Sequence, residues 1–177
     1  MNPARDHVLI GKERHDVGRP HDEGYPIRGI VKNDMLYLHN FEPSRWPACN
    51  PETGYLNCDG SPTKTQILKA HRQNPGDIHW ALCFGKHSEA ELYDLKTDCD
   101  CLTNLSGRAT SQPLQAQLKQ QLFDELKAQD DPRMLGNGQM FEQFPYSDPS
   151  QRNFYERFMG GEKLRPSWVN ESDFEPN

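Results

Sequence analysis

One long segment of the chain has a regular apolar period, from Ser111 to Gln129. Gln and Lys fill one side of it, and leucine recurs on the other side at every fourth position, at Leu114, Leu118, Leu122 and Leu126. This spacing is typical of a helix with one apolar stripe, and Ser111 followed by Pro113 suits its first turn. Such a helix is stable when its stripe is buried against a second layer.

Short runs rich in apolar and β-branched residues are the candidates for that second layer. Residues 25–40 predict a hairpin, because Asn33 and Asp34 near its centre tolerate left-handed backbone geometry. Residues 7–11 and 90–95 have strand-like patterns as well. We therefore expect an α+β fold, in which a small antiparallel sheet carries the packed C-terminal helix.

Proline and glycine punctuate the rest of the chain, with 14 and 13 residues respectively. We expect a helix from about Pro62 to Arg72, capped by the Ser61 hydroxyl. We also expect a buried strand or turn at 79–84 and a surface loop over 41–60. Beyond the leucine-rich helix, prolines break any period while aromatic residues recur, which is unusual for a disordered tail. The expected organisation is a folded subdomain, 1–130, followed by an extended, aromatic-containing arm, 131–177.

Composition limits the classes of partner. Hydrophobic residues make up 34% of the 177 residues, so the core is thin for the length, and the formal net charge is −6. An acidic chain has no general electrostatic attraction to nucleic acid or to an anionic membrane, so neither is expected as a partner. No run approaches the roughly 20 apolar residues of a membrane-spanning helix, and residues 2–7 do not resemble an export leader. The sequence leaves the localisation open.

Two cysteine-containing segments invite a chemical interpretation. Residues 49–53 (Cys-Asn-Pro-Glu-Thr) approach a Cys-x-Pro-x-Arg nucleophile motif, but Thr53 cannot hold an anion as arginine does. Residues 98–101 (Asp-Cys-Asp-Cys) lack a second ligand pair, so an Asx-rich turn is expected there. The five cysteines are expected to be free thiols, with a Cys49–Cys58 disulfide as the alternative. No catalytic residue and no metal ligand is assigned.

The densest group of polar side chains follows the first expected strand and includes Arg14, His15, Asp16 and Arg19. Arginine grips sulfate, phosphate or carboxylate with a planar fork, histidine donates or accepts near neutral pH, and aspartate accepts from a sugar hydroxyl. These residues therefore suit an anionic, polyhydroxylated ligand. The alternative is a solvated loop whose opposite charges merely balance.

Several segments, taken in order, resemble the C-terminal region of the formylglycine-dependent sulfatases, particularly the heparan N-sulfatase (N-sulfoglucosamine sulfohydrolase) branch. They are VLIGKERHD at 8–16, GYPIRGI at 24–30, LYLHNF at 36–41, and ELYDL at 91–95 leading to Asn104-Leu105. The resemblance covers roughly residues 7–130. It implies a subdomain of antiparallel strands with one packed helix, which agrees with the pattern above.

The resemblance also implies what lies outside this sequence. The family's metal-binding residues, nucleophile motif and sulfate-handling Lys and His would precede residue 1. Calcium and formylglycine are therefore expected in an N-terminal catalytic domain, the implied partner. By resemblance, Arg14, His15 and Asp16 contact the hydroxyls or carboxylate of a sulfated sugar at the pocket wall, and Arg19 is a weaker candidate. The chain would then belong to a sulfuric ester or N-sulfate hydrolase and be inactive by itself.

Two other functions stay open at this point. The chain could be a stand-alone module that binds sulfated glycans through Arg14, His15 and Asp16, or a non-catalytic structural remnant. A complete small hydrolase would need a nucleophile that the sequence does not show. A subdomain that docks on a larger domain exposes apolar surface when alone, so the isolated chain is expected to be marginally stable or to self-associate.

Overall fold

The computed structural model describes residues 6–176, and the contacts within the chain divide it into two compact units. Unit 1 consists of residues up to 13, 26–42 and 88–141, and unit 2 of residues 14–25, 43–87 and those from 142 onward. This division differs from the expected boundary after residue 130, because the last part of the chain does not stand apart. It contributes first to unit 1 and then, after residue 141, to unit 2.

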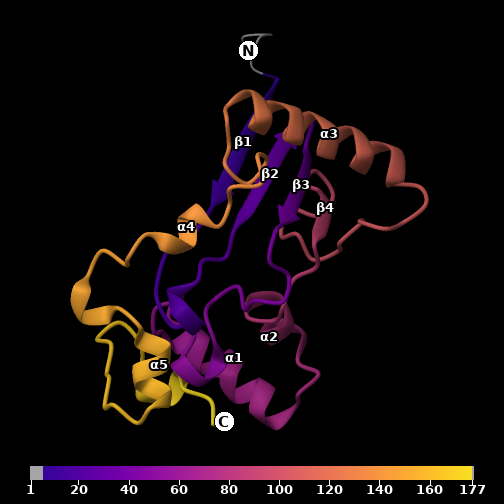
Figure 1. The fold of residues 1–177 in the computed structure, drawn as a ribbon. Coiled ribbons are helices and arrows are strands. Elements are labelled where there is room, and N and C mark those ends of the chain that lie inside the picture. The colour runs from indigo at the N-terminus through magenta and orange to yellow at the C-terminus, as the bar shows by residue number, and fades with distance from the viewer. Residues whose placement is uncertain (1–5, 177) are drawn as a thin grey trace. The chain divides into compact units, whose positions relative to one another are not determined.

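Unit 1 contains a four-stranded antiparallel sheet in the order β1-β2-β3-β4 (Figure 1). The strands are β1 (His7–Lys12), β2 (Ile27–Lys32), β3 (Met35–Asn40) and β4 (Ala90–Asp94). The expected hairpin is confirmed: Asn33 and Asp34, between β2 and β3, have φ values of 49° and 59°. Both residues thus adopt the left-handed geometry that a two-residue hairpin turn requires.

Helix α3 (Gln112–Ala128) packs on one face of this sheet. Leu118, Leu122 and Leu126 of the helix form a buried cluster with Ile30, Tyr37 and Leu92 of the strands. The apolar stripe that defines the helix in the sequence therefore meets three different strands. Unit 1 has the expected α+β architecture, an antiparallel sheet with one long helix packed on it (Figure 1).

The opposite face of the sheet keeps exposed apolar side chains. Leu9 packs against the cluster under α3, so its neighbours Val8 and Ile10 point to the other face, where they are 60% and 42% exposed. Gly29 lies between Ile10 and Leu38, since a Cβ there would be 3.0 Å from the former and 2.6 Å from the latter. We call the surface formed by Val8, Ile10 and Leu38 the open sheet face.

Unit 2 is built from helices and loops, without a strand among its described residues. Its helices are α1 (Pro62–Gln73), α2 (Ile78–Cys83) and α5 (Phe154–Met159), while α4 (Met140–Gln143) lies where the chain passes between the units. Short 3-10 helices occupy Pro20–Asp22, Pro51–Thr53, Pro149–Gln151 and Glu171–Asp173.

Two expectations for unit 2 concern helix starts. Ser61 caps α1 as predicted, because its hydroxyl oxygen accepts a hydrogen bond from the Lys64 amide at 3.1 Å. The strand or turn expected at 79–84 is wrong, since most of that segment is helix α2. The Asp77 carboxylate accepts from the Trp80 amide at 2.9 Å, and this cap starts the helix just before the apolar run.

The segment 41–60 lacks long helices and strands, but the expectation of a surface loop is wrong. Cys49 and Leu56 are fully buried and form a core cluster with Val17 and Phe154. The aromatic residues of the C-terminal arm supply the apolar partners that the loop itself lacks. The arm is therefore part of the core of unit 2.

Candidate functional site

The loop that follows β1 belongs to unit 2, and Arg14 ties it to the C-terminal arm. The guanidinium donates from Nη1 to the carbonyl oxygen of Asp22 at 3.0 Å and from Nη2 to that of Phe144 at 2.8 Å. Its central carbon lies 5.8 Å from the centroid of the Tyr146 ring, within cation–π range. Arg14 thus shapes the loop while staying partly accessible.

His15 is the exposed member of the predicted group. Its side chain makes no hydrogen bond to any residue that the structure describes. The imidazole therefore has both ring nitrogens available to donate to or accept from a ligand.

Asp16 is almost buried, with 8% of its surface exposed. Its Oδ1 accepts from the Val17 amide at 2.8 Å and from the Tyr146 hydroxyl at 3.4 Å. Burial raises the pKa of Asp16, and burial together with the neighbouring Asp16 carboxylate raises the pKa of Tyr146. Perturbed carboxyl groups of this kind are enriched at functional sites. Arg14, Asp16 and Tyr146 therefore form one polar cluster with His15 beside it.

Arg19 has a different environment, with only 1% of its surface exposed. Its Nε donates to the carbonyl oxygen of Trp46 at 2.8 Å and its Nη2 to that of Pro47 at 2.9 Å. Burial lowers the pKa of Arg19, and the Tyr25 ring centroid lies 5.5 Å from the guanidinium. Arg19 thus holds the backbone of the neighbouring loop beneath the surface, whereas Arg14, His15 and Asp16 lie closer to solvent.

One site residue, Tyr146, escapes the sequence analysis, because it carries no local signal that pairs it with Asp16. Asp22, by contrast, belongs to the same polar stretch of sequence as Arg14 and Asp16. Asp22 is 7% exposed, and its Oδ2 accepts from the Asn153 amide at 2.7 Å while its Oδ1 is buried without a hydrogen bond. His21 and Asp22 both have positive φ, 57° and 53°. Consecutive left-handed residues are uncommon outside glycine, so the contacts around this loop must hold it in shape.

The cysteine-containing segments have structural roles. The Thr53 hydroxyl is buried and donates to the carbonyl oxygens of Gly18 and Asn50 at 2.8 and 2.9 Å. The Asp98 carboxylate accepts from the amides of Leu102 and Thr103 at 3.0 and 2.8 Å, and the Asp98 carbonyl oxygen accepts from the Cys101 amide at 3.1 Å, so the expected Asx-rich turn is present. The five cysteines are free thiols. Within residues 6–176 no group of three or more His, Cys, Asp or Glu side chains could hold a metal ion.

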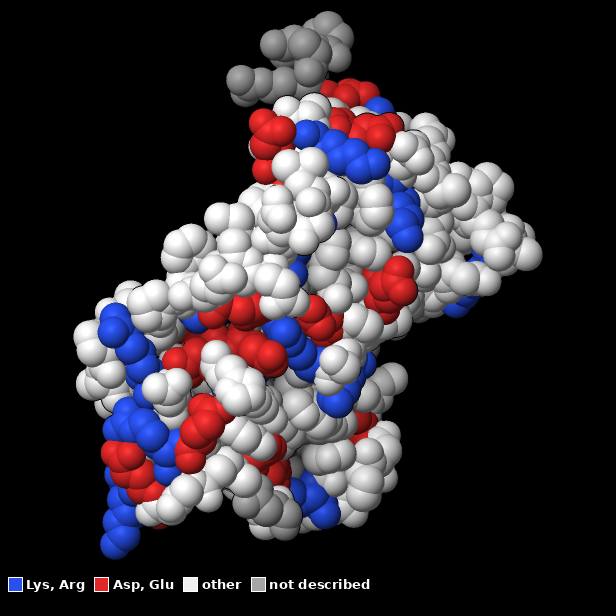
Figure 2. All heavy atoms as spheres, viewed as in Figure 1, with Lys and Arg blue, Asp and Glu red and all other residues white. Residues whose placement is uncertain are grey.

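On the face shown in Figure 2, acidic and basic side chains are interspersed, without a broad field of one sign. Among the described helices, none has the length and apolarity to cross a membrane.

No protein-family model matches the chain, and no curated protein shows detectable similarity to it.

Proposed function

We propose that this chain is the C-terminal region of a formylglycine-dependent sulfatase acting on sulfated sugars, and that the loop carrying Arg14, His15 and Asp16 forms part of the substrate-pocket wall. The ordered resemblance across residues 7–130 supports the proposal. The antiparallel sheet with one packed helix in unit 1 is compatible with it.

The open sheet face gives the proposal its strongest structural support. An antiparallel sheet with one solvated face normally presents polar side chains there. In unit 1 the β1 edge of that face presents Val8 and Ile10 instead, and Val8 is 60% exposed. At the other edge, Glu91 and Tyr93 of β4 lie on the same face and are only 8% and 7% exposed. A catalytic domain with a complementary apolar surface would cover the exposed side chains near β1.

The roles that we propose for the residues of the loop follow from the site geometry. The His15 imidazole, exposed and without a hydrogen bond to the described residues, contacts a hydroxyl or carboxylate of the sugar. Arg14 and Asp16 hold the loop and, through Tyr146, its contact with the arm. The proposal assigns these residues to substrate binding and assigns no step of sulfate transfer to them.

The intact mass of the native product in its source tests the assignment. A product much larger than 20.4 kDa, with an upstream Cys- or Ser-x-Pro-x-Arg segment, would support it. A native product of 20.4 kDa would contradict the sulfatase function and leave glycan binding or a structural role.

Steady-state kinetics of that larger product test the role of the loop. His15→Ala is expected to raise KM for an N-sulfoglucosamine substrate about tenfold with little change in kcat, because it removes one hydrogen bond to the sugar. The matched control is His79→Ala, which alters an exposed histidine on α2. Equal KM values for the His15 and His79 variants would overturn the assignment.

A further inference from the structure

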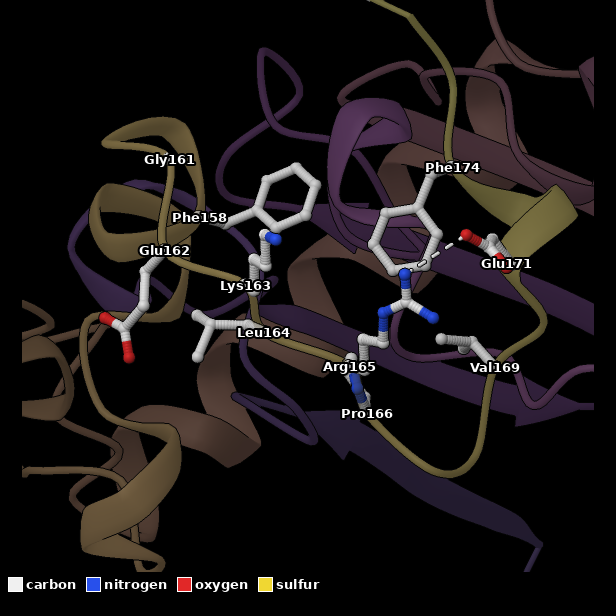
Figure 3. A pocket seen from close by; sticks show the side chains of 10 residues that line it. All are labelled: Phe158, Gly161, Glu162, Lys163, Leu164, Arg165, Pro166, Val169, Glu171 and Phe174. Carbon is white, nitrogen blue, oxygen red and sulfur yellow. Dashed lines mark hydrogen bonds and ion pairs between the residues drawn. The ribbon is translucent and has the colours of Figure 1, made fainter.

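A cavity of about 540 Å³ lies in the last part of unit 2 (Figure 3). Its apolar lining comes from Phe158, Leu164, Pro166, Val169 and Phe174. The rings of Phe158 and Phe174 stack with their centroids 5.3 Å apart. The volume falls within the range of small-molecule sites, which are mostly apolar with a few polar groups that orient the ligand.

Two cationic side chains line the same cavity, Lys163 and Arg165. Figure 3 shows both side chains among those that line the cavity, with a dashed line from the Arg165 guanidinium to Glu171. Two cations and an apolar surface thus line the same cavity.

The charges around the cavity do not cancel. Glu162 is bound by Arg157, with Oε2 and Nε 2.7 Å apart. Arg165 pairs with Glu171 at 3.3 Å, but these side chains are 78% and 85% exposed, and such pairs are weak. Lys163 has no ion pair or hydrogen bond within the part of the chain that the structure describes. One positive charge therefore stays uncompensated beside an apolar surface.

We propose that this cavity binds a small amphipathic organic anion, with an apolar body against Leu164, Val169 and the phenylalanine pair and one oxyanion group at Lys163 and Arg165. A free sugar fits less well, because a polyhydroxylated ligand needs many polar partners and most of the lining is apolar. The site is separate from the loop at 14–16, and the inference does not rest on the proposed sulfatase function.

Isothermal titration calorimetry of the full chain tests the proposal, with naphthalene-2-sulfonate as the anionic probe and 2-naphthol as its neutral counterpart. The anion is expected to bind with a Kd below about 1 mM, and the neutral compound at least about tenfold more weakly. Replacing the sulfonate by naphthalene-2-carboxylate shows whether the site accepts both kinds of oxyanion, and binding of either one supports the proposal.

The K163Q/R165Q double variant is expected to weaken binding of the anion at least about tenfold while leaving 2-naphthol unchanged. The matched control, K69Q/R108Q, removes two exposed cations outside the cavity and should bind both compounds as the parent chain does. Tryptophan fluorescence of each variant checks that unit 2 is folded. Unchanged anion affinity in K163Q/R165Q, equal affinity for the two compounds, or no anion binding up to about 5 mM would overturn the proposal.

Discussion

Lys64 and Asp173 form an ion pair inside unit 2, with Nζ and Oδ2 3.2 Å apart and side-chain exposures of 1% and 0%. The Lys64 ammonium also donates to the carbonyl oxygens of Gly54 at 2.9 Å and Cys58 at 2.6 Å. One buried cation thus connects the start of α1, the loop before it and the end of the chain. Its charge is balanced by a carboxylate that lies more than a hundred residues away in the sequence.

Lys64→Met is expected to lower the free energy of unfolding of unit 2 by about 3–5 kcal/mol, because it leaves the Asp173 carboxylate buried and unpaired. Trp46, Trp80 and Trp168, the three tryptophans of the chain, all belong to unit 2. Urea unfolding followed by tryptophan fluorescence therefore reports on that unit. Lys69→Met, on the exposed side of α1, should change the free energy of unfolding by less than about 0.5 kcal/mol. Similar losses in the two variants would refute a stabilising role for the pair.

The isolated chain is expected to self-associate through the open sheet face. Val8→Lys with Ile10→Lys should raise the dissociation constant of the oligomer at least about tenfold, because the two charges replace exposed apolar side chains. Light scattering after size-exclusion chromatography measures the change. Leu135→Lys alters another exposed apolar residue of unit 1, 52% exposed and outside the sheet, and should have little effect. A parent chain that is monomeric at about 100 µM would contradict this prediction.

Two histidines of unit 1 are expected to titrate on opposite sides of 6.5, the ordinary value. Hydrogen bonds to Asp6 and Glu125, each at 2.7 Å, raise the pKa of His7. Burial lowers the pKa of His39. NMR titration of the ring protons measures both values, and a pKa of His7 below that of His39 would contradict the geometry.

The raised pKa of His7 has a consequence for stability. The contribution of protonated His7 to the free energy of unfolding is fully present below the unfolded-state pKa of about 6.5. It is lost as the pH rises through the higher folded-state pKa. The difference in unfolding free energy between the parent chain and His7→Gln should therefore be larger at pH 5.5 than at pH 8.5. Hydrogen exchange of the β1 and β2 amides reports on unit 1. A difference that grows with pH would reverse the sign expected here.

Asp16 should behave as a group that lowers stability when charged. Burial raises its pKa, so the folded state holds the proton more tightly than the unfolded state, and stability falls as the pH rises from the ordinary value of 3.8. Asp16→Asn keeps an acceptor for the Val17 amide and removes this cost. The free energy of unfolding of the variant minus that of the parent chain is therefore expected to be larger at pH 7 than at pH 4. An equal difference at the two pH values would show that the Asp16 carboxylate is not perturbed.

Elements that depend on neighbouring residues could be predicted from the sequence. The turn at Asn33 and Asp34 needs two residues that tolerate left-handed geometry, and the Ser61 cap needs a hydroxyl next to the first turn of α1. The sequence did not predict helix α2, because its capping residue, Asp77, precedes the apolar run from which a strand or turn was inferred. Capping and turn residues therefore predicted the start of a helix or hairpin when they lay inside the stretch of sequence from which the element was inferred.

The candidate site was predictable only in part, because half of each contact lies elsewhere in the sequence. Asp16 stood out as a loop carboxylate, but its partner Tyr146 is 130 positions away. Arg19 looks like an anion-binding residue in the sequence, since a guanidinium suits carbonyl oxygens and oxyanions alike. Its burial against Trp46 and Pro47 is visible only in three dimensions.

The two units alternate along the chain, which passes between them five times, after residues 13, 25, 42, 87 and 141. Any cut between residues 14 and 141 consequently divides both units at once, and neither can be obtained as one continuous piece of the gene. A single recombination joint cannot transfer one unit to another protein without fragments of the other. The two units must therefore be inherited, expressed and engineered together.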